Sequence, residues 1–308
     1  MDTTSQTRKE APFFSVVIPL YNKEKNIERT INSVLSQTFS DYEIIVVDDG
    51  STDNGPVLVR SKFGSQVRLV EKANGGVSSA RNLGVNRSQG RWIALLDADD
   101  IWCPDHLKSF FYAISKYPDG RLFGGAYNIC SSGTLLPPPN RIVGEGYVQD
   151  YFRVAKTNTL FWTSAVVINK KVFEKVGGFD ERISIGEDLD LWFRVNALYK
   201  TVFVNNVVAI YNTDAGNRAM RKKYDFSKTF FAYLDKYDNS SSSVQKFVCY
   251  LRARYLPYMV YKYSLGKDEY HSLIKKIKRT SAGKSAFYRF IPYRVLAVLA
   301  KLMYYGKE

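Results

Sequence analysis

The chain has 308 residues, of which 45% are hydrophobic, so it can form one large α/β domain with an appended segment, or two domains. It has only two histidines, and its three cysteines, Cys103, Cys130 and Cys249, lie far apart without a CxxC pair. These counts argue against a disulfide framework and against a zinc site, and we expect a reducing compartment.

The beginning of the chain lacks the basic-then-apolar order of a secretory signal. No run approaches the roughly 18 apolar residues that cross a bilayer as a helix. We therefore expect a cytoplasmic protein.

The formal net charge of +14 is concentrated in the last third of the chain. Residues 1–216 contain 24 Lys and Arg against 24 Asp and Glu, whereas residues 217–308 contain 20 against 6. The same final segment holds 13 of the 22 tyrosines. The excess of positive charge therefore belongs to one segment and not to the chain as a whole.

Residues 14–213 alternate apolar runs with helical patterns, which is typical of βαβ units and a mostly parallel sheet. In chain order, strands are expected within 14–22, 42–54, 68–73 and 91–100, and helices within 24–37 and across 78–85. The segment between residues 54 and 68 is expected to be a loop. Several of these strands end in polar residues, and ligands of open α/β sheets bind outside the carboxyl ends of the strands.

Beyond residue 100 the periodicity is less regular, but elements can still be assigned. We expect a helix near 104–117, a strand and a short helix within 160–181, a helix over 188–199 and a strand over 201–212. From about residue 217 strand signals disappear, and helices are expected over 244–265 and 286–305.

The sequence thus predicts an α/β fold of the Rossmann-like type, with a mixed, mostly parallel sheet flanked by helices. It predicts a disordered N-terminal arm over 1–13, a globular domain over 14–216 and a mainly helical, basic and aromatic C-terminal region over 217–308.

Three carboxylates follow the strand that ends in "LLDADD". Such groups repel one another unless a cation lies among them, and Asp97-x-Asp99 can hold Mg²⁺ or Mn²⁺ that in turn bridges phosphate oxygens. Alternatively, Asp99 or Asp100 caps the helix that begins near Pro104.

The preceding strand ends in "DDGSTD", where a carboxylate can accept hydrogen bonds from a nucleobase imide or a ribose. An Asx-turn explains the same residues. Arg81, at the start of a helix behind Gly75 and Gly76, can hold a diphosphate or pair with a nearby carboxylate.

Glu187 and Asp188 open a further predicted helix. A carboxylate there can act as the general base that deprotonates an acceptor hydroxyl. The alternative is that both are first-turn acids that favour the helix dipole.

These elements occur in an order that resembles the family 2 glycosyltransferases, which are inverting enzymes of the GT-A fold. The resemblance covers about residues 14–213 and rests on six motifs: "VVIPLYN" (16–22), "VVDDGSTD" (46–53), "GGVSSARNLG" (75–84), "LLDADD" (95–100), "GGFDE" (177–181) and "GEDLDLWFRV" (186–195).

The resemblance implies a role for each matching residue. Pro19, Tyr21 and Asp49 would line the nucleobase and ribose pocket, and Asp97 would face the ribose or the sugar. Arg81 would lie near the diphosphate. Asp99 would ligate Mn²⁺ or Mg²⁺, and Asp188 would be the catalytic base of a direct displacement.

One departure from the family concerns a histidine that many relatives carry after the base helix. This chain reads "AIYNTDAGNRAM" (209–220) there. Asn212 or Asp214 could replace the histidine as an oxygen ligand, or Arg218 could hold the diphosphate. His106, after the acidic motif, is expected to be a surface or packing residue.

The basic C-terminal region allows three interpretations. It could bind an anionic membrane surface, with Phe287, Phe290, Ile291, Leu296, Leu299 and Leu302 or Met303 against lipid. It could pack on the catalytic domain, or it could bind nucleic acid. We expect an apolar face of this region to be packed and we expect membrane contact as well. We expect no nucleic acid, because no nucleic-acid-binding motif accompanies the charge.

The sequence therefore predicts a cytoplasmic glycosyltransferase, peripherally associated with the inner face of the membrane. It would move a sugar, with UDP-sugar as the expected donor, to a hydroxyl of a lipid-linked glycan in bacterial surface polysaccharide synthesis. Two alternatives are a nucleotidyltransferase, although no Gly-rich phosphate loop follows the first strand, and a catalytically silent nucleotide-binding module.

Overall fold

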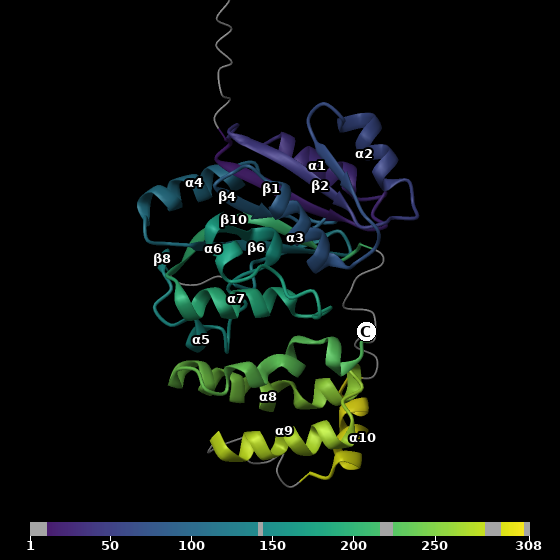
Figure 1. Cartoon of the computed structure of the whole chain (residues 1–308), viewed down its shortest axis with the longest axis vertical. Coiled ribbons are helices and arrows are strands. Elements are labelled where there is room, and N and C mark those ends of the chain that lie inside the picture. Colours follow the sequence, from purple (N-terminus) through teal and green to yellow (C-terminus); the bar gives the residue numbers. More distant parts are fainter. Residues whose placement is uncertain (1–10, 141–143, 216–223, 281–290, 305–308) are drawn as a thin grey trace, which may run out of the picture. The chain divides into compact units, whose positions relative to one another are not determined.

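The computed structural model describes residues 11–140, 144–215, 224–280 and 291–304 (Figure 1). It consists of two compact units. The first comprises the described residues within 1–147, 161–178 and 200–214, and the second those within 148–160, 179–199 and 215–308. Most of the predicted N-terminal arm, residues 1–10, lies outside the described residues.

The first unit is built on one mixed sheet, as predicted. Its strands run in the order β3 (Arg68–Glu71), β2 (Tyr42–Asp48), β1 (Phe14–Leu20), β4 (Trp92–Leu95), β9 (Val166–Asn169), β6 (Leu122–Ser131), β10 (Thr201–Asn212) and β5 (Ile101–Trp102). The first four are parallel, β9 is antiparallel to both neighbours, β10 is parallel to β6, and β5 is antiparallel to β10. The short strands β7 (Thr134–Leu136) and β8 (Gly146–Tyr147) pair with β6 and β10.

Helices cover both faces of the parallel half of this sheet. Val16, Ile18 and Leu20 of β1 share a core with α1 (Ile27–Leu35), α2 (Gly55–Phe63) and α4 (His106–Lys116). The opposite face of the sheet packs on α3 (Val77–Arg87). This arrangement follows from the period of two in a strand, which sends alternate apolar side chains to opposite faces.

Gly84 allows α3 to pack closely against the sheet. A Cβ atom at this position would come within 2.4 Å of Cγ1 of Val17 and 3.2 Å of Cγ2 of Val47. The glycine therefore sets how near the helix that carries Arg81 can approach β1 and β2.

The prediction of a loop between residues 54 and 68 is wrong, because α2 occupies most of it. Pro56 stands in the first turn, where a missing N–H costs nothing. Val59 and Phe63, one turn apart, are buried in the same core as α1. Val57 and Leu58 directly precede Val59, so the apolar residues of this segment form a run and not a clear helical repeat.

The second unit contains helices and 3₁₀ segments. They are α5 (Tyr151–Val154), α7 (Glu187–Leu198), η3 (Phe226–Lys228), η4 (Phe230–Tyr237), α8 (Ser242–Lys262), α9 (Lys267–Thr280) and α10 (Tyr293–Tyr304). The first unit also has η1 (Thr163–Ala165) and α6 (Lys170–Lys175). Nowhere in the described ranges does a helix combine the length and the apolar character needed to cross a membrane.

The division into units differs from the predicted linear boundary at residue 216. The segments 148–160 and 179–199 are grouped with the C-terminal helices, because their aromatic rings pack on α8. The ring of Phe247 lies 5.7 Å from that of Phe152 and 5.9 Å from that of Phe193. Sequence reasoning missed this because it read the chain as consecutive segments.

Candidate active site

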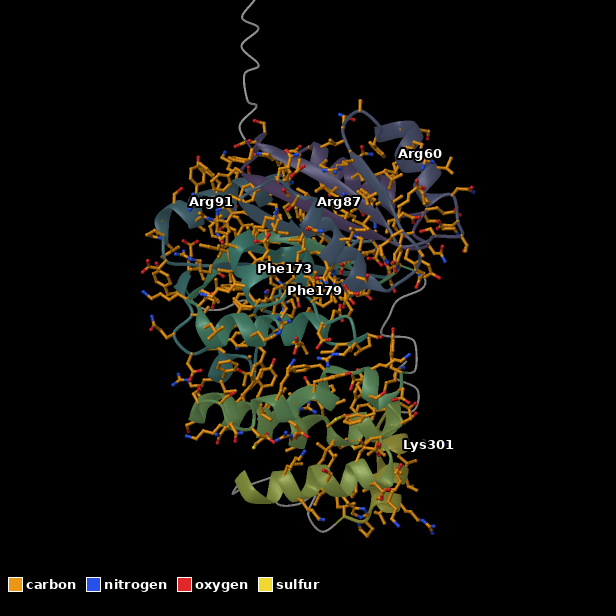
Figure 2. The ribbon with its side chains drawn as sticks, in the orientation of Figure 1. Arg60, Arg87, Arg91, Phe173, Phe179 and Lys301 are labelled. Carbon is orange, nitrogen blue, oxygen red and sulfur yellow. The ribbon has the colours of Figure 1, made fainter. Side chains whose placement is uncertain are left out.

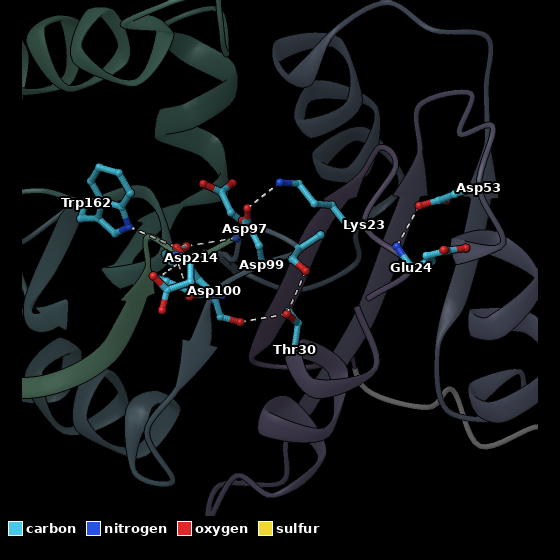
Figure 3. Close-up of polar contacts among 12 residues, drawn as sticks. Lys23, Glu24, Thr30, Asp53, Asp97, Asp99, Asp100, Trp162 and Asp214 are labelled. Carbon is cyan, nitrogen blue, oxygen red and sulfur yellow. Dashed lines mark hydrogen bonds and ion pairs between the residues drawn. The ribbon is translucent and has the colours of Figure 1, made fainter. Parts of the chain in front are cut away.

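The loops that follow β1, β2 and β4 meet at one edge of the sheet, at the carboxyl ends of these parallel strands. The clearest sign is an ion pair between Lys23, after β1, and Asp99, after β4, with Nζ 2.7 Å from Oδ2 (Figure 3). Both side chains are largely buried, at 13% and 18% exposed. The pair therefore joins the loops that follow the neighbouring strands β1 and β4.

A second ion pair connects α3 to the same acidic loop. Nη2 of Arg81 lies 2.6 Å from Oδ1 of Asp97, and the Arg81 side chain is only 4% exposed. Arg81 therefore pairs with a nearby carboxylate, one of the two interpretations that the sequence left open, and its guanidinium lies at the edge where the acids gather.

The backbone of the acidic loop is fixed by Thr30 of α1, which sequence reasoning missed. Its buried hydroxyl lies 3.0 Å from the carbonyl oxygen of Ala98 and 2.8 Å from that of Asp100 (Figure 3). A threonine on the inner face of an amphipathic helix was the available signal, but nothing in the sequence says which carbonyls it meets.

Asp100 points into the protein. Its carboxyl group accepts hydrogen bonds from the Ser164 hydroxyl at 2.6 Å, from Nε1 of Trp162 at 3.2 Å and from the Asn212 backbone N–H at 2.9 Å. Burial, followed by the charges of Asp97 and Asp99, raises the pKa of Asp100 to about 8. This residue therefore anchors the loop.

The alternative in which Asp99 or Asp100 caps the following helix is wrong. α4 begins at His106, and Asp105 occupies the N-cap position. Asp99 is paired with Lys23 instead. The carboxylates of Asp97 and Asp99 thus have no capping role and remain at the sheet edge.

Asp49 is tied to the loop that starts α3. Its oxygens accept hydrogen bonds from the backbone N–H groups of Gly75 and Gly76, at 2.9 and 2.8 Å, and from Nζ of Lys72 at 2.6 Å. The local turn predicted for "DDGSTD" exists as well, but it uses Asp48, which accepts from the Ser51 N–H at 3.2 Å.

Pro19 and Tyr21 lie on either side of the end of β1. Pro19 is half-buried within the strand, opposite Val47 of β2, and Tyr21 is 37% exposed in the following loop. Asn22 has a positive φ of 52°, and its side-chain oxygen accepts from the Thr52 N–H at 2.8 Å. This contact joins the loops after β1 and β2. Six of the predicted residues belong to the first unit and lie toward the carboxyl edge of its sheet: Pro19, Tyr21, Asp49, Arg81, Asp97 and Asp99.

Asp188 belongs to the second unit. It lies in the first turn of α7, half-buried, and Oδ1 accepts from the Leu189 N–H at 2.7 Å. Burial, followed by the charge of Asp188, raises the pKa of the Tyr151 phenol. The next acid along the helix, Asp190, is fully buried and forms ion pairs with Arg194 and Lys236. The ion pair with Lys236 connects α7 with η4.

The residues considered as replacements for the missing histidine have other partners. The carboxylate of Asp214 accepts from the backbone N–H groups of Ser132 and Gly133, at 2.7 and 3.2 Å. The side-chain oxygen of Asn212 accepts from the Asp214 N–H at 3.2 Å. Arg218 lies outside the described residues. His106 is fully buried and stacked on Trp102, so it is a packing residue.

Whether this edge suits a divalent cation depends on its donor set. Within the described ranges, no three Asp, Glu, His or Cys side chains form a group that could hold a metal ion by themselves. Asp97 and Asp99 nevertheless keep 25% and 18% of their side chains exposed. One or two carboxylates completed by substrate phosphates is a usual arrangement for Mg²⁺, so these residues fit a metal that arrives with a nucleotide.

Open α/β sheets bind their ligands outside the carboxyl ends of the strands, and this is the edge where the acids and cations of this chain gather. Comparison with known proteins makes this specific. The model of the family described as glycosyl transferase family 2 matches residues 15–177, which is more than half of the chain. The chain therefore belongs to this family.

Curated relatives agree with this assignment. An uncharacterized glycosyltransferase of Rickettsia conorii is 32% identical over 200 residues, which are 61% of this chain and 33% of the relative. The chondroitin synthase of Pasteurella multocida is 27% identical over 223 residues, 70% of this chain and 22% of the synthase. The chain thus spans a third or less of the length of these two relatives.

Solved structures show the same fold. Residues 1–349 of Staphylococcus aureus TarS in complex with UDP-GlcNAc align with a TM-score of 0.76 and 16% identity, over 95% of this chain and 92% of that one. A mannosyltransferase of Pyrobaculum calidifontis in complex with GDP-Man and Mn²⁺ aligns with a TM-score of 0.61 and 18% identity, over 97% and 89%. The fold is therefore that of the GT-A glycosyltransferases.

Proposed function

We propose that the protein is an inverting hexosyltransferase that moves a sugar from a UDP-sugar to a hydroxyl of a glycan acceptor. The observation that carries this proposal is the pairing of Lys23 with Asp99 and of Arg81 with Asp97 at one sheet edge. A diphosphate needs cations, and a metal that accompanies it needs carboxylates. The complex of TarS with UDP-GlcNAc supports the choice of UDP-sugar.

In this proposal, the residues of the first unit bind the donor. Asp49, whose oxygens already order the Gly75–Gly76 loop, lies with Pro19 and Tyr21 along the nucleobase and ribose. Asp97 faces the ribose or the sugar. Arg81 contributes its positive charge to the diphosphate, for which a planar guanidinium is well suited.

Asp99 would hold Mn²⁺ or Mg²⁺. When bound, such a cation stabilises the negative charge that develops on the departing nucleoside diphosphate. The Mn²⁺ in the mannosyltransferase complex supports this assignment. Lys23 supplies one positive charge to Asp99 without a metal.

Asp188 is the proposed general base. Its carboxylate takes the proton of the acceptor hydroxyl while the acceptor oxygen bonds to the anomeric carbon and the bond from that carbon to the diphosphate breaks. A single displacement inverts the anomeric configuration and needs no covalent intermediate. The motif "GEDLDLWFRV" supports the role, and Asp188 lies half-buried in the first turn of α7.

Two substitutions separate donor binding from catalysis. Asp188→Asn keeps the shape and removes the base, so we expect UDP affinity within about twofold of wild type and turnover lowered at least about a hundredfold. Asp99→Asn should instead remove the dependence of UDP affinity on Mn²⁺. Calorimetric titration with UDP, with and without Mn²⁺, and release of UDP from UDP-sugars measure both effects.

Asp268→Asn, an exposed carboxylate at the start of α9, is the matched control and should change neither quantity. Near-normal turnover by Asp188→Asn would disprove the base assignment. A wild-type protein that binds UDP but releases none from any UDP-sugar would instead be a silent nucleotide-binding module.

We also propose that the acceptor is a lipid-linked glycan at the inner face of the cytoplasmic membrane, as part of surface polysaccharide synthesis. The support is the charge of the C-terminal segment, 20 Lys and Arg against 6 Asp and Glu, which suits an anionic lipid surface. Incorporation of labelled sugar into the lipid extract of cells that express the protein, and not into that of cells expressing Asp188→Asn, tests this proposal.

A further inference from the structure

α10 presents two apolar faces. Leu296 and Ala300 are buried, at 2% and 0% exposed. Five other large apolar side chains of this 12-residue helix are exposed to solvent, by 41–72%: Val295, Val298, Leu299, Leu302 and Met303. Their spacing of three and four residues places all five on one side of the helix, which we call the α10 stripe.

The helix that carries this stripe is held in place within the second unit. The Tyr304 ring lies 5.4 Å from that of Tyr258 and 5.7 Å from that of Tyr261, both in α8. At the other end, the Tyr293 hydroxyl donates to the Leu265 carbonyl at 2.9 Å. α10 therefore has a fixed inner face, and the α10 stripe is a separate surface.

The α10 stripe differs from the apolar face expected from the sequence. Leu296 was expected to meet lipid but is buried, whereas Val295 and Val298 were not expected there and are exposed. Phe287 and Phe290 lie outside the described residues. A continuous helical repeat cannot show which of two apolar faces a neighbouring helix covers.

Positive charge accompanies the α10 stripe. Arg294 and Lys301 are exposed on the same helix, and α10 has no acidic residue. Figure 2 labels Lys301 on this helix. At 100° per residue, both cations lie on the flank of the stripe that faces away from Leu296 and Ala300. An aliphatic strip with cations along one flank is typical of helices that lie in a membrane interface.

We propose that the α10 stripe docks on an anionic lipid bilayer, with its five side chains at the boundary of the acyl chains and with Arg294 and Lys301 among the headgroups. A second copy of the chain is disfavoured as the occupant, because it would bring the same positive charge. Nucleic acid is disfavoured because aliphatic side chains do not stack on bases as aromatic ones do. The purpose of docking rests on the proposed lipid-linked acceptor, but the docking itself does not.

Vesicle sedimentation with the full chain tests this proposal. Wild type should sediment with phosphatidylcholine vesicles that contain about 30% phosphatidylserine, and more weakly with pure phosphatidylcholine. Val298→Ser with Leu302→Ser should weaken binding at least about tenfold, since each side chain loses part of its burial in lipid. Arg294→Gln with Lys301→Gln should weaken it by about tenfold or more, and only on the anionic vesicles.

Val57→Ser with Leu198→Ser is the matched control. Val57 and Leu198 are exposed by 58% and 69%, which is close to the 60% and 72% of Val298 and Leu302. Val57 lies on α2 and Leu198 on α7, away from the α10 stripe. The control should bind vesicles as wild type does. Circular dichroism and thermal melting of every variant confirm that a loss of binding is not a loss of folding.

Equal binding of wild type and Val298→Ser/Leu302→Ser to anionic vesicles would overturn the proposal, and so would an absence of wild-type binding. A concentration-dependent dimer in wild type that this variant abolishes, without vesicle binding, would assign the stripe to a second copy. Turnover on a water-soluble acceptor is measured in parallel. Turnover without vesicle binding refutes only the docking surface, and vesicle binding without turnover refutes only the proposed function.

Discussion

At the scale of single residues, the contact of Lys23 with Asp99 has the most direct consequence for metal binding. An ammonium 2.7 Å from Oδ2 competes with any cation for that carboxylate. We expect Lys23→Met to bind Mn²⁺ alone about tenfold more tightly than wild type does, because the carboxylate is then unpaired. Titration calorimetry with MnCl₂ in the absence of nucleotide measures this affinity.

Lys25→Met provides the control for that experiment, since Lys25 is an exposed lysine two residues further along. It should leave the Mn²⁺ affinity unchanged. If Lys23→Met bound Mn²⁺ more weakly than wild type, Lys23 would be holding Asp99 in its binding position and not competing for it.

His106 makes stability depend on pH. Burial lowers the pKa of its imidazole from 6.5 to about 3, and Nδ1 donates to the Val208 carbonyl at 3.0 Å. Below pH 6.5 the unfolded chain takes up a proton that the folded protein does not, so the contribution of His106 to stability is complete above this pH and is lost as pH falls toward 3.

His106→Phe keeps an aromatic ring beside Trp102 and removes the titration. We expect the free energy of unfolding of wild type, relative to this variant, to fall by about 2 kcal/mol between pH 7 and pH 5. Urea unfolding at both pH values measures it. The quantity to compare is the difference in free energy of unfolding between wild type and His106→Phe at each pH. The raised pKa of Asp100 makes both proteins less stable as pH rises, and this effect cancels in the difference. A difference that did not change with pH would contradict the assignment.

At the scale of elements, the packing of α3 on β1 depends on Gly84. Gly84→Ala would bring a Cβ atom within 2.4 Å of Val17. We expect the free energy of unfolding to fall by about 1–3 kcal/mol despite the better helix propensity of alanine, because the helix must move away from the sheet. UDP affinity should fall too, since Arg81 moves with α3.

Asn86→Ala on the exposed side of the same helix is the control for this substitution. It gains the helix propensity of alanine without touching the sheet. Urea unfolding and UDP titration of both variants separate the two effects. A Gly84→Ala protein as stable as Asn86→Ala would show that α3 can shift without cost.

The elements also show how far local patterns carry. The helix expected over 188–199 is α7, Glu187–Leu198, and the strand expected over 201–212 is β10, Thr201–Asn212, because both are long local segments rich in apolar residues. α2 was missed because its apolar residues, Val57, Leu58, Val59 and Phe63, do not follow a clear helical spacing. The antiparallel place of β9 between β4 and β6 could not be predicted, because a short apolar strand has the same pattern in either direction.

At the scale of the whole molecule, the segment that carries the positive charge does not coincide with either compact unit. The excess of positive charge follows the sequence and begins at about residue 217. The compact units do not follow it, because 148–160 and 179–199 are built into the second unit. The proposed donor-binding residues and the proposed base, Asp188, therefore belong to different units, although their motifs succeed one another along the chain.

The sequence by itself predicted the α/β class and the family, and it proposed residues for the candidate site, because six motifs occur in one order along the chain. Only the tertiary structure decided the partners of those residues: Lys23 for Asp99, the Gly75–Gly76 loop for Asp49, and Ser164, Trp162 and Asn212 for Asp100. It also decided which apolar face of α10 stays exposed. The physical reason is that periodicity fixes the side of an element on which a residue lies, whereas its partner comes from another element whose position only the packed core determines.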